Sequence, residues 1–158
     1  MKWKPAPLIK VYEALGSIAD GRFELNANTA KVYSSSGNKF YDVVYDPENN
    51  AITANDNGSY WIGYLGYPSI VLLLALGVVK YEPKLAEYLK GFAWKDINQK
   101  FSNNFLKTQV YIDEQIKKKY QINLDEFHAA LEKIQADVNA LQLNKLDSGK
   151  KPPEGYWV

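Results

Sequence analysis

The sequence contains no cysteine and only one histidine, His128, so several kinds of chemistry are excluded. Without cysteine there are no disulfide bonds, thiolate nucleophiles, or cysteine-ligated zinc or iron–sulfur centres. A single imidazole falls short of the several nitrogen or sulfur ligands that zinc sites usually take. We therefore expect no metal site and no cofactor, and the absence of cysteine fits a reducing cytoplasm.

An excess of charge of one sign is also lacking, since 19 basic and 18 acidic side chains leave a net charge of +1. This balance creates no long-range field that would concentrate nucleic acid or anionic lipid. The most apolar stretch, residues 70–79, is much shorter than the roughly 20 residues of a membrane-spanning helix. Residues 1–5 are not followed by the apolar run of a signal peptide. The sequence thus predicts a cytoplasmic protein without membrane contact, and it disfavours a nucleic-acid partner.

With 158 residues, of which 46% are hydrophobic and 23% charged, the chain has the size and composition of one globular domain. We expect a single α+β domain over residues 1–158, with an extended tail at residues 147–158 whose prolines and glycines exclude helix. The tail carries Tyr156 and Trp157, which should bury either on the domain itself or on a second copy. The sequence leaves open whether the protein is a monomer or a homodimer.

Three segments share a pattern in which proline stands near the first helical position and glycine just past the last. Proline's missing N–H group is not needed at the first position, and glycine accepts the left-handed conformation that ends a helix. This pattern predicts helices over residues 7–20, 68–76 and 83–90, closed by Gly21, Gly77 and Gly91. The middle helix is almost entirely apolar and is expected to be buried.

Between Gly21 and Asn57 the apolar pattern changes to a period of two, interrupted by clusters of turn-forming residues. This pattern predicts four short strands over residues 22–25, 29–34, 39–45 and 51–55, joined by hairpin loops into an antiparallel meander. Alternation is expected to place Val32, Phe40, Val44, Ile52 and Ala54 on one face and Lys31, Tyr33, Tyr41, Val43, Tyr45 and Thr53 on the other.

The last third of the chain predicts a C-terminal αα-hairpin. Helical spacing of apolar residues from Trp94 to Tyr120 predicts one long helix, and a narrow stripe starting at Phe127 predicts a final helix packed against it. Asn123 and Glu126 have the spacing of a capping box at the corner between them. The expected fold is therefore α+β: an N-terminal helix, a four-stranded antiparallel meander, a central apolar helix, a short helix and the hairpin.

The segment 55–68 is the most unusual part of the sequence, because small polar side chains are followed by aromatic residues interleaved with glycines. It precedes the apolar helix, whose N-terminus favours negative charge. We expect a pocket in which Asp56 and Asn57 hydrogen-bond a polar ligand while Tyr60, Trp61 and Tyr64 stack on it. The alternative is that the polar residues form a turn and the aromatic residues fill the seam between sheet and helices.

Three other features have ordinary structural explanations. His128 lies at the edge of the final helical stripe and is expected to have a structural role. Arg22, the only arginine, is expected to pair with Glu24 or Asp42 on nearby strands rather than to clamp a ligand. The lysines at 117–119 suit the negative end of a helix dipole, and only together with those at 150 and 151 would they form a basic patch.

Three hypotheses about function follow from these features. The first, which the aromatic strands and the 55–68 segment favour, is a non-catalytic protein that binds a small ligand or a protein partner. The second is an enzyme that uses carboxylate and tyrosine chemistry around Asp56, whose pKa an adjacent apolar helix would raise. The third is a structural or assembly protein that dimerises through its helical hairpin or its tail.

Overall fold

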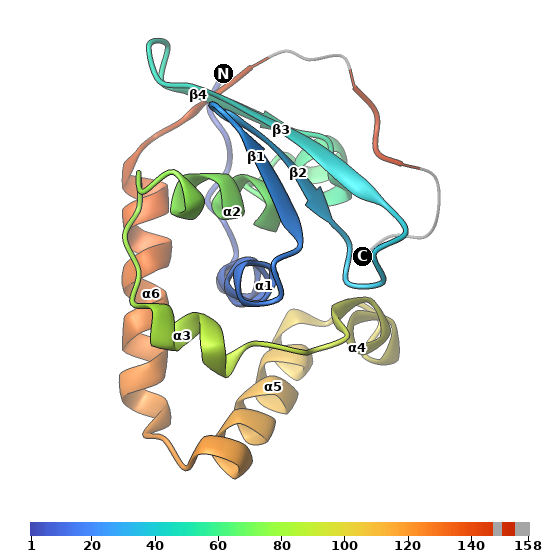
Figure 1. Cartoon of the computed structure of the whole chain (residues 1–158), viewed down its shortest axis with the longest axis vertical. Helices are drawn as coiled ribbons and strands as arrows, with labels where there is room; N and C mark the ends of the chain where they lie inside the picture. The colour runs from blue at the N-terminus through green and yellow to red at the C-terminus, as the bar shows by residue number, and fades with distance from the viewer. Residues whose placement is uncertain (147–149, 154–158) are drawn as a thin grey trace.

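The chain begins with a helix, continues into a β-meander and ends in a succession of helices (Figure 1). The computed structural model describes residues 1–146 and 150–153, so Tyr156 and Trp157 of the expected tail lie outside the described residues. The first part holds α1 (Leu8–Ala19), β1 (Phe23–Asn26), β2 (Thr29–Tyr33), β3 (Phe40–Asp46) and β4 (Ala51–Ala54). The π-helical turn η1 (Gly58–Ile62) leads to α2 (Tyr67–Ala75), α3 (Pro83–Tyr88), α4 (Trp94–Lys100), α5 (Phe105–Tyr120), α6 (Leu124–Ala140) and β5 (Asn144–Lys145). The predicted α+β fold class is thus confirmed.

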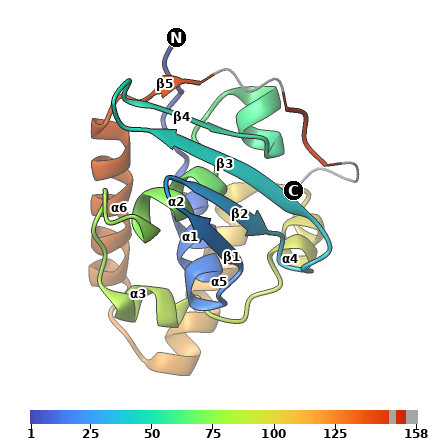
Figure 2. The ribbon, with the colours of Figure 1, turned by 45° about the horizontal axis from the view of Figure 1, so that its top comes forward.

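The sheet has the strand order β1-β2-β3-β4-β5. Its first four strands are the predicted antiparallel meander, with boundaries close to those expected. The fifth strand was not predicted: β5 runs parallel to β4, with Asn144 opposite Ala51 (Figure 2). A strand of 2 residues has no alternation of its own, so only pairing with a distant segment defines it.

The faces predicted for the strands are wrong in β3. Tyr41 pairs with Val32 and is 6% exposed, whereas Phe40 pairs with Tyr33 on the opposite face and is 41% exposed. A slip of one residue turns every side chain of a strand over, and the loop between β2 and β3 decides this register. The inner face holds Val32, Tyr41, Val43, Tyr45, Ile52 and Ala54, and the outer face holds Lys31, Tyr33, Phe40, Val44 and Thr53. The tyrosines are therefore divided between the two sides of the sheet.

Helix α1 is the hub of the helical layer. It packs against α2, α3, α5 and α6, while α2 lies between it and the inner face of the sheet (Figures 1 and 2). Every residue of α1 from Ile9 to Ser17 is buried, including charged ones. Gly21, Gly77 and Gly91 follow α1, α2 and α3 in the left-handed conformation, as their positions predicted. Within the part of the chain that the structure describes, no helix has the length and apolar character needed to cross a membrane.

The long helix expected over residues 94–120 is in fact two helices, α4 and α5. Between them Ser102 and Asn103 have φ values of 52° and 59°, in the left-handed region, where a right-handed helix cannot continue. Asn104 then caps α5, because its side chain accepts a hydrogen bond from the backbone N–H of Lys107 at 3.1 Å. The Ser-Asn-Asn cluster was a signal for this break, but apolar spacing across it suggested continuity.

The predicted corner between the last two helices is confirmed, since the backbone N–H of Glu126 donates to Asn123 Oδ1 at 3.2 Å. From this corner α5 and α6 diverge instead of forming the expected continuous seam (Figures 1 and 2). Tyr12 of α1 contacts both helices, through a hydrogen bond to Asp113 and an edge-to-face contact with Phe127 at 5.8 Å between ring centroids. Tyr12 of α1 thus contacts both helices where they diverge.

Candidate functional site

The structure divides the residues expected to line a pocket between the inside and the outside of the molecule. Asp56 and Tyr64 are buried, with 6% and 7% of their surface exposed. Tyr60 and Trp61 are 40% and 63% exposed, and Asn57 is intermediate. The segment thus brings Asp56 and Tyr64 together beneath η1 and Tyr60 and Trp61 together on its outer side.

The turn that separates the two sides, η1, is a π-helix, a rare form that is often found at functional sites. Its closing hydrogen bond runs from the N–H of Gly63 to the carbonyl of Gly58 at 2.9 Å, and Gly63 has a φ of 92° that a side chain would strain. A Cβ on Gly58 would overlap the Tyr64 ring. A Cβ on Gly66 would overlap the Asp56 carboxylate. The glycines therefore allow the two buried side chains to lie directly against the backbone.

The carboxylate of Asp56 is held beneath η1 by the turn itself. Its Oδ1 accepts a hydrogen bond from Ser59 Oγ at 2.6 Å, and its Oδ2 accepts one from the backbone N–H of Ser59 at 3.2 Å. Burial raises the pKa of Asp56, and the hydrogen bonds from Ser59 and the charge of Lys10 act against this rise. Asp56 is thus bound within the protein and has little surface to offer a ligand.

A buried ion pair on α1 lies below the same turn. Lys10 Nζ is 3.3 Å from Glu13 Oε1, and the two residues are 3% and 2% exposed. Asn98 Nδ2 donates to the same oxygen at 3.2 Å. Burial alone would lower the pKa of Lys10, but Glu13, followed by Tyr64 and Asp56, raises it above its ordinary value. The Lys10 ammonium group of α1 is therefore close enough to Tyr64 and Asp56 beneath η1 to interact with them electrostatically.

The sequence did not reveal the buried layer that Lys10, Glu13, Asp56 and Tyr64 form beneath η1. Lys10 and Glu13 are spaced as an i, i+3 pair, a pattern that usually belongs to a solvent-exposed helix face. Their burial arises because α1 is covered on all sides by other elements, which no local pattern indicates. Helix segments this completely enclosed keep charged residues only when each has a partner.

The outer side of η1 presents three consecutive large side chains, Tyr60, Trp61 and Ile62, which we call the η1 patch. Their exposed fractions are 40%, 63% and 44%. The Tyr60 and Trp61 rings meet edge to face with 4.6 Å between centroids. Exposed apolar residues are usually scattered singly over a protein surface. Three consecutive exposed large side chains on one turn form a continuous patch, which is unusual for a surface without a binding role.

Segments far apart in the chain fix the base of the η1 patch. The N–H of Lys4 donates to the carbonyl of Gly63 at 2.9 Å, and the N–H of Leu65 donates to the carbonyl of Lys4 at 3.2 Å. The ammonium group of Lys145 lies against Gly63. Lys4 and Lys145 are exposed, so the apolar patch has a basic border.

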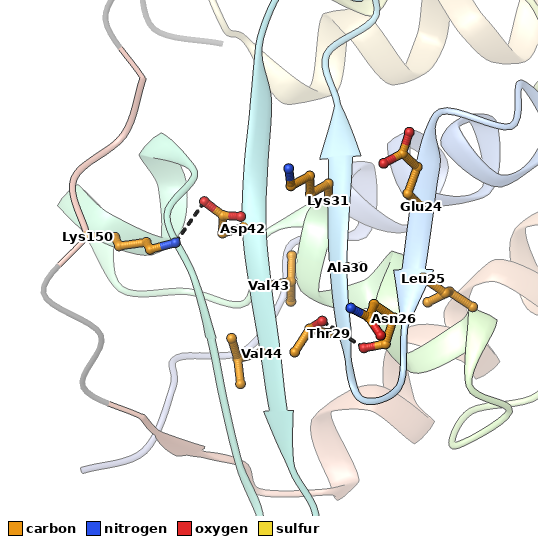
Figure 3. A pocket seen from close by; sticks show the side chains of 10 residues that line it. All are labelled: Glu24, Leu25, Asn26, Thr29, Ala30, Lys31, Asp42, Val43, Val44 and Lys150. Carbon is orange, nitrogen blue, oxygen red and sulfur yellow. Dashed lines mark hydrogen bonds and ion pairs between the residues drawn. The ribbon is translucent and has the colours of Figure 1, made fainter.

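The outer face of the sheet forms a second surface, which is lined by both charged and apolar side chains (Figure 3). A shallow cavity of about 450 Å³ lies over β1, β2 and β3, bordered by Glu24, Lys31, Asp42 and Lys150. Lys150 pairs with Asp42 at 3.0 Å, as the dashed line in Figure 3 shows. Lys150 therefore lies over the sheet, apart from the lysines at 117–119 on α5, and the two groups do not form one basic patch.

Arg22 has a partner other than those expected, and His128, for which no partner was predicted, has one on a neighbouring helix. Arg22 pairs with Asp20 at 3.3 Å and donates to the carbonyl of Tyr33 at 2.8 Å, instead of pairing with Glu24 or Asp42. Its side chain therefore joins Asp20, which follows α1, to Tyr33, the last residue of β2. His128 is bonded to Asp113 on α5. Among the described residues, no three histidine, aspartate or glutamate side chains are grouped to hold a metal ion.

The fold and the site together define an α+β protein with a helical hub and a rigid, partly apolar turn beside the sheet. The profile of the family described as uncharacterised conserved protein UCP014422 matches residues 3–144, so the chain belongs to this family. The matched range includes α1, the meander, η1 and the helices that enclose the buried layer. No curated protein and no solved structure matches the chain.

Proposed function

We propose that the protein is a non-catalytic binding protein that docks onto a protein partner through the η1 patch. The observation that carries this proposal is the exposure of Tyr60, Trp61 and Ile62 side by side on one turn. Tryptophan and tyrosine are the residues that most often dominate the binding energy of protein interfaces. Leaving an indole ring in water forfeits the free energy that its burial on a partner would provide.

The rigidity of η1 supports the same function. The turn is held from inside by Asp56 and Ser59 and from the side by the backbone of Lys4. A side chain presented on a fixed backbone loses little conformational entropy when it binds, so more of the contact energy appears as affinity. The buried residues beneath η1 thus hold the backbone of the η1 patch in one conformation for binding.

The border of the patch defines the chemistry of the partner. Lys4 and Lys145 flank an apolar centre, which is the usual arrangement of an apolar interface core within a polar rim. The matching surface is an apolar pocket that accepts the Trp61 ring and carries carboxylates at its edge. The alternative of catalysis at Asp56 has less support, because both of its oxygens are already hydrogen-bonded within the turn.

The experiment compares partner capture by the full-length wild-type protein, Trp61→Ala and Leu106→Ala. Leu106 on α5 is 71% exposed and serves as the matched apolar control. We expect a protein that is captured by wild type and by Leu106→Ala and lost with Trp61→Ala. With that protein purified, Trp61→Ala should weaken the Kd by at least about tenfold, as a truncated hot spot does.

Two results would contradict the proposal. If no captured protein depends on Trp61, the η1 patch is not a docking surface. If wild type sediments as a dimer and Trp61→Ala as a monomer, the patch binds a second copy of the chain, and the separate partner is ruled out. Both variants should unfold within about 0.5 kcal/mol of wild type, since each replaces an exposed side chain.

A further inference from the structure

A second surface draws together cationic and aromatic side chains where the end of α3 meets the C-terminal half of α5. We propose that this cavity, of about 510 Å³, binds a small anion that carries a flat ring, of the nucleoside monophosphate class. We call it the α3–α5 cavity, and it is separate from the η1 patch. Its lining includes Tyr88, Lys90, Phe92, Lys118, Lys119 and Tyr120.

The charge of the α3–α5 cavity is of one sign. Among the described residues, three lysines line it and no aspartate or glutamate does, although the whole chain balances 19 basic residues with 18 acidic ones. The dipole of α5 accounts for Lys118 and Lys119 at its C-terminal end, but Lys90 comes from the turn after α3. Among the described residues, neither Lys90 nor Lys118 has a carboxylate partner within ion-pair distance. The site therefore attracts an anion that the described part of the chain does not supply.

Aromatic rings form the other part of the lining. The rings of Tyr88 and Tyr120 lie 4.9 Å apart between centroids, and the Tyr120 hydroxyl donates to the carbonyl of Glu87 at 3.4 Å. Phe92 packs against Trp94 with 6.0 Å between centroids. Each of the three lining rings is only partly buried, so one part packs on the core and another part borders the cavity. Such rings provide surfaces on which a planar ligand stacks.

Size and charge together select the ligand class. Pockets for small molecules commonly enclose about 300–1,000 Å³, so this cavity suits one nucleotide-sized molecule. Lysine ammonium groups bind phosphate as point charges, and the ring surfaces bind a base. A net charge of +1 gives no long-range attraction for a polynucleotide, which favours the small ligand.

The test titrates AMP, adenosine and inorganic phosphate separately into the full-length protein, followed by isothermal calorimetry and amide chemical shifts. We expect AMP to bind saturably and each fragment to bind at least about tenfold more weakly, because each uses only part of the lining. Lys118→Gln/Lys119→Gln should weaken AMP binding at least about tenfold. The matched control, Lys107→Gln/Lys117→Gln, removes the same charge from exposed positions of α5 outside the lining and should change the Kd by less than about twofold.

A variant of the ring wall separates stacking from charge. Tyr120→Leu should weaken AMP binding while leaving phosphate binding unchanged, and its circular dichroism should match wild type. If that variant does not fold, the two lysine double variants decide the matter alone. The proposal is overturned if AMP does not saturate, or if both double variants lose affinity equally. It is also overturned if only oligonucleotides bind, with an affinity that grows with their length, since the surface is then a strand-binding one.

Discussion

His128 Nε2 and Asp113 Oδ2 are 2.7 Å apart and join α6 to α5 near the corner between these helices. The other oxygen of Asp113 accepts a hydrogen bond from the Tyr12 hydroxyl of α1, also at 2.7 Å. Asp113 is 7% exposed, so its carboxylate needs both partners to offset the loss of water. The only histidine of the chain thus takes part in a chain of hydrogen bonds that connects three helices.

We expect the pair His128 and Asp113 to be coupled energetically. A double-mutant cycle with Asp113→Asn and His128→Gln, measured by urea denaturation, should give a coupling energy of about 1 kcal/mol or more. The exposed pair Lys133 and Asp137, with 2.9 Å between charged atoms, is the control, and its cycle should give less than about 0.5 kcal/mol. Equal coupling in the two cycles would show that burial adds nothing to the His128 contact.

Close packing of Gly66 against Asp56 leads to a second prediction. Gly66→Ala places a Cβ on the Asp56 carboxylate and should lower the free energy of unfolding by about 2 kcal/mol. Gly37→Ala meets no neighbouring atoms but has a φ of +77°, so it should cost only about 1 kcal/mol for backbone strain. In the double variant Asp56→Ala/Gly66→Ala the carboxylate that the new Cβ would meet is gone, so part of the free energy of unfolding lost in Gly66→Ala should be regained. A Gly66→Ala cost no larger than that of Gly37→Ala would contradict the packing inferred for η1.

The raised pKa of Asp56 predicts how the free energy of unfolding depends on pH. Because burial raises this pKa above the ordinary 3.8, the folded state favours the protonated carboxyl group. Its stabilising contribution is complete below pH 3.8 and is lost as the pH rises through the folded-state pKa. The free energy of unfolding of wild type minus that of Asp56→Asn should therefore fall over the pH range above 3.8. A difference that stays constant in denaturation experiments across this range would mean that Asp56 titrates as it does in the unfolded chain.

The turn between β1 and β2 offers a stabilising substitution. Ala27 has a φ of 55°, in the left-handed region that costs an L-residue with a Cβ about 1–2 kcal/mol. Ala27→Gly removes this strain and adds about 0.4–1 kcal/mol of unfolded-state entropy, so the net gain should be about 0.5 kcal/mol. Thermal unfolding would record it as a rise in Tm, and Ala19→Gly, within α1, is the control that should lower Tm. A lower Tm for Ala27→Gly would show that the turn does not strain Ala27.

Features that depend on neighbouring residues could be predicted from the sequence. Gly21 ends α1 because glycine accepts the left-handed conformation, and Asn123 begins α6 because its side chain reaches the N–H of Glu126. The four strands of the meander follow from their period of two and the turn residues between them. The 55–68 segment also stood out by composition alone, although its pattern did not separate its buried residues from its exposed ones.

Only the tertiary structure decided the rest. The register that turns Tyr41 inward, the pairing of β5 with β4, the burial of Lys10 and Glu13, and the bond between Asp113 and His128 all join segments distant in the chain. Such contacts form only when the whole core assembles around α1, because their free energy comes from excluding water among several elements at once. Local spacing determined α1 and the four strands of the meander, and packing around α1 determined which side chains are buried and which are exposed.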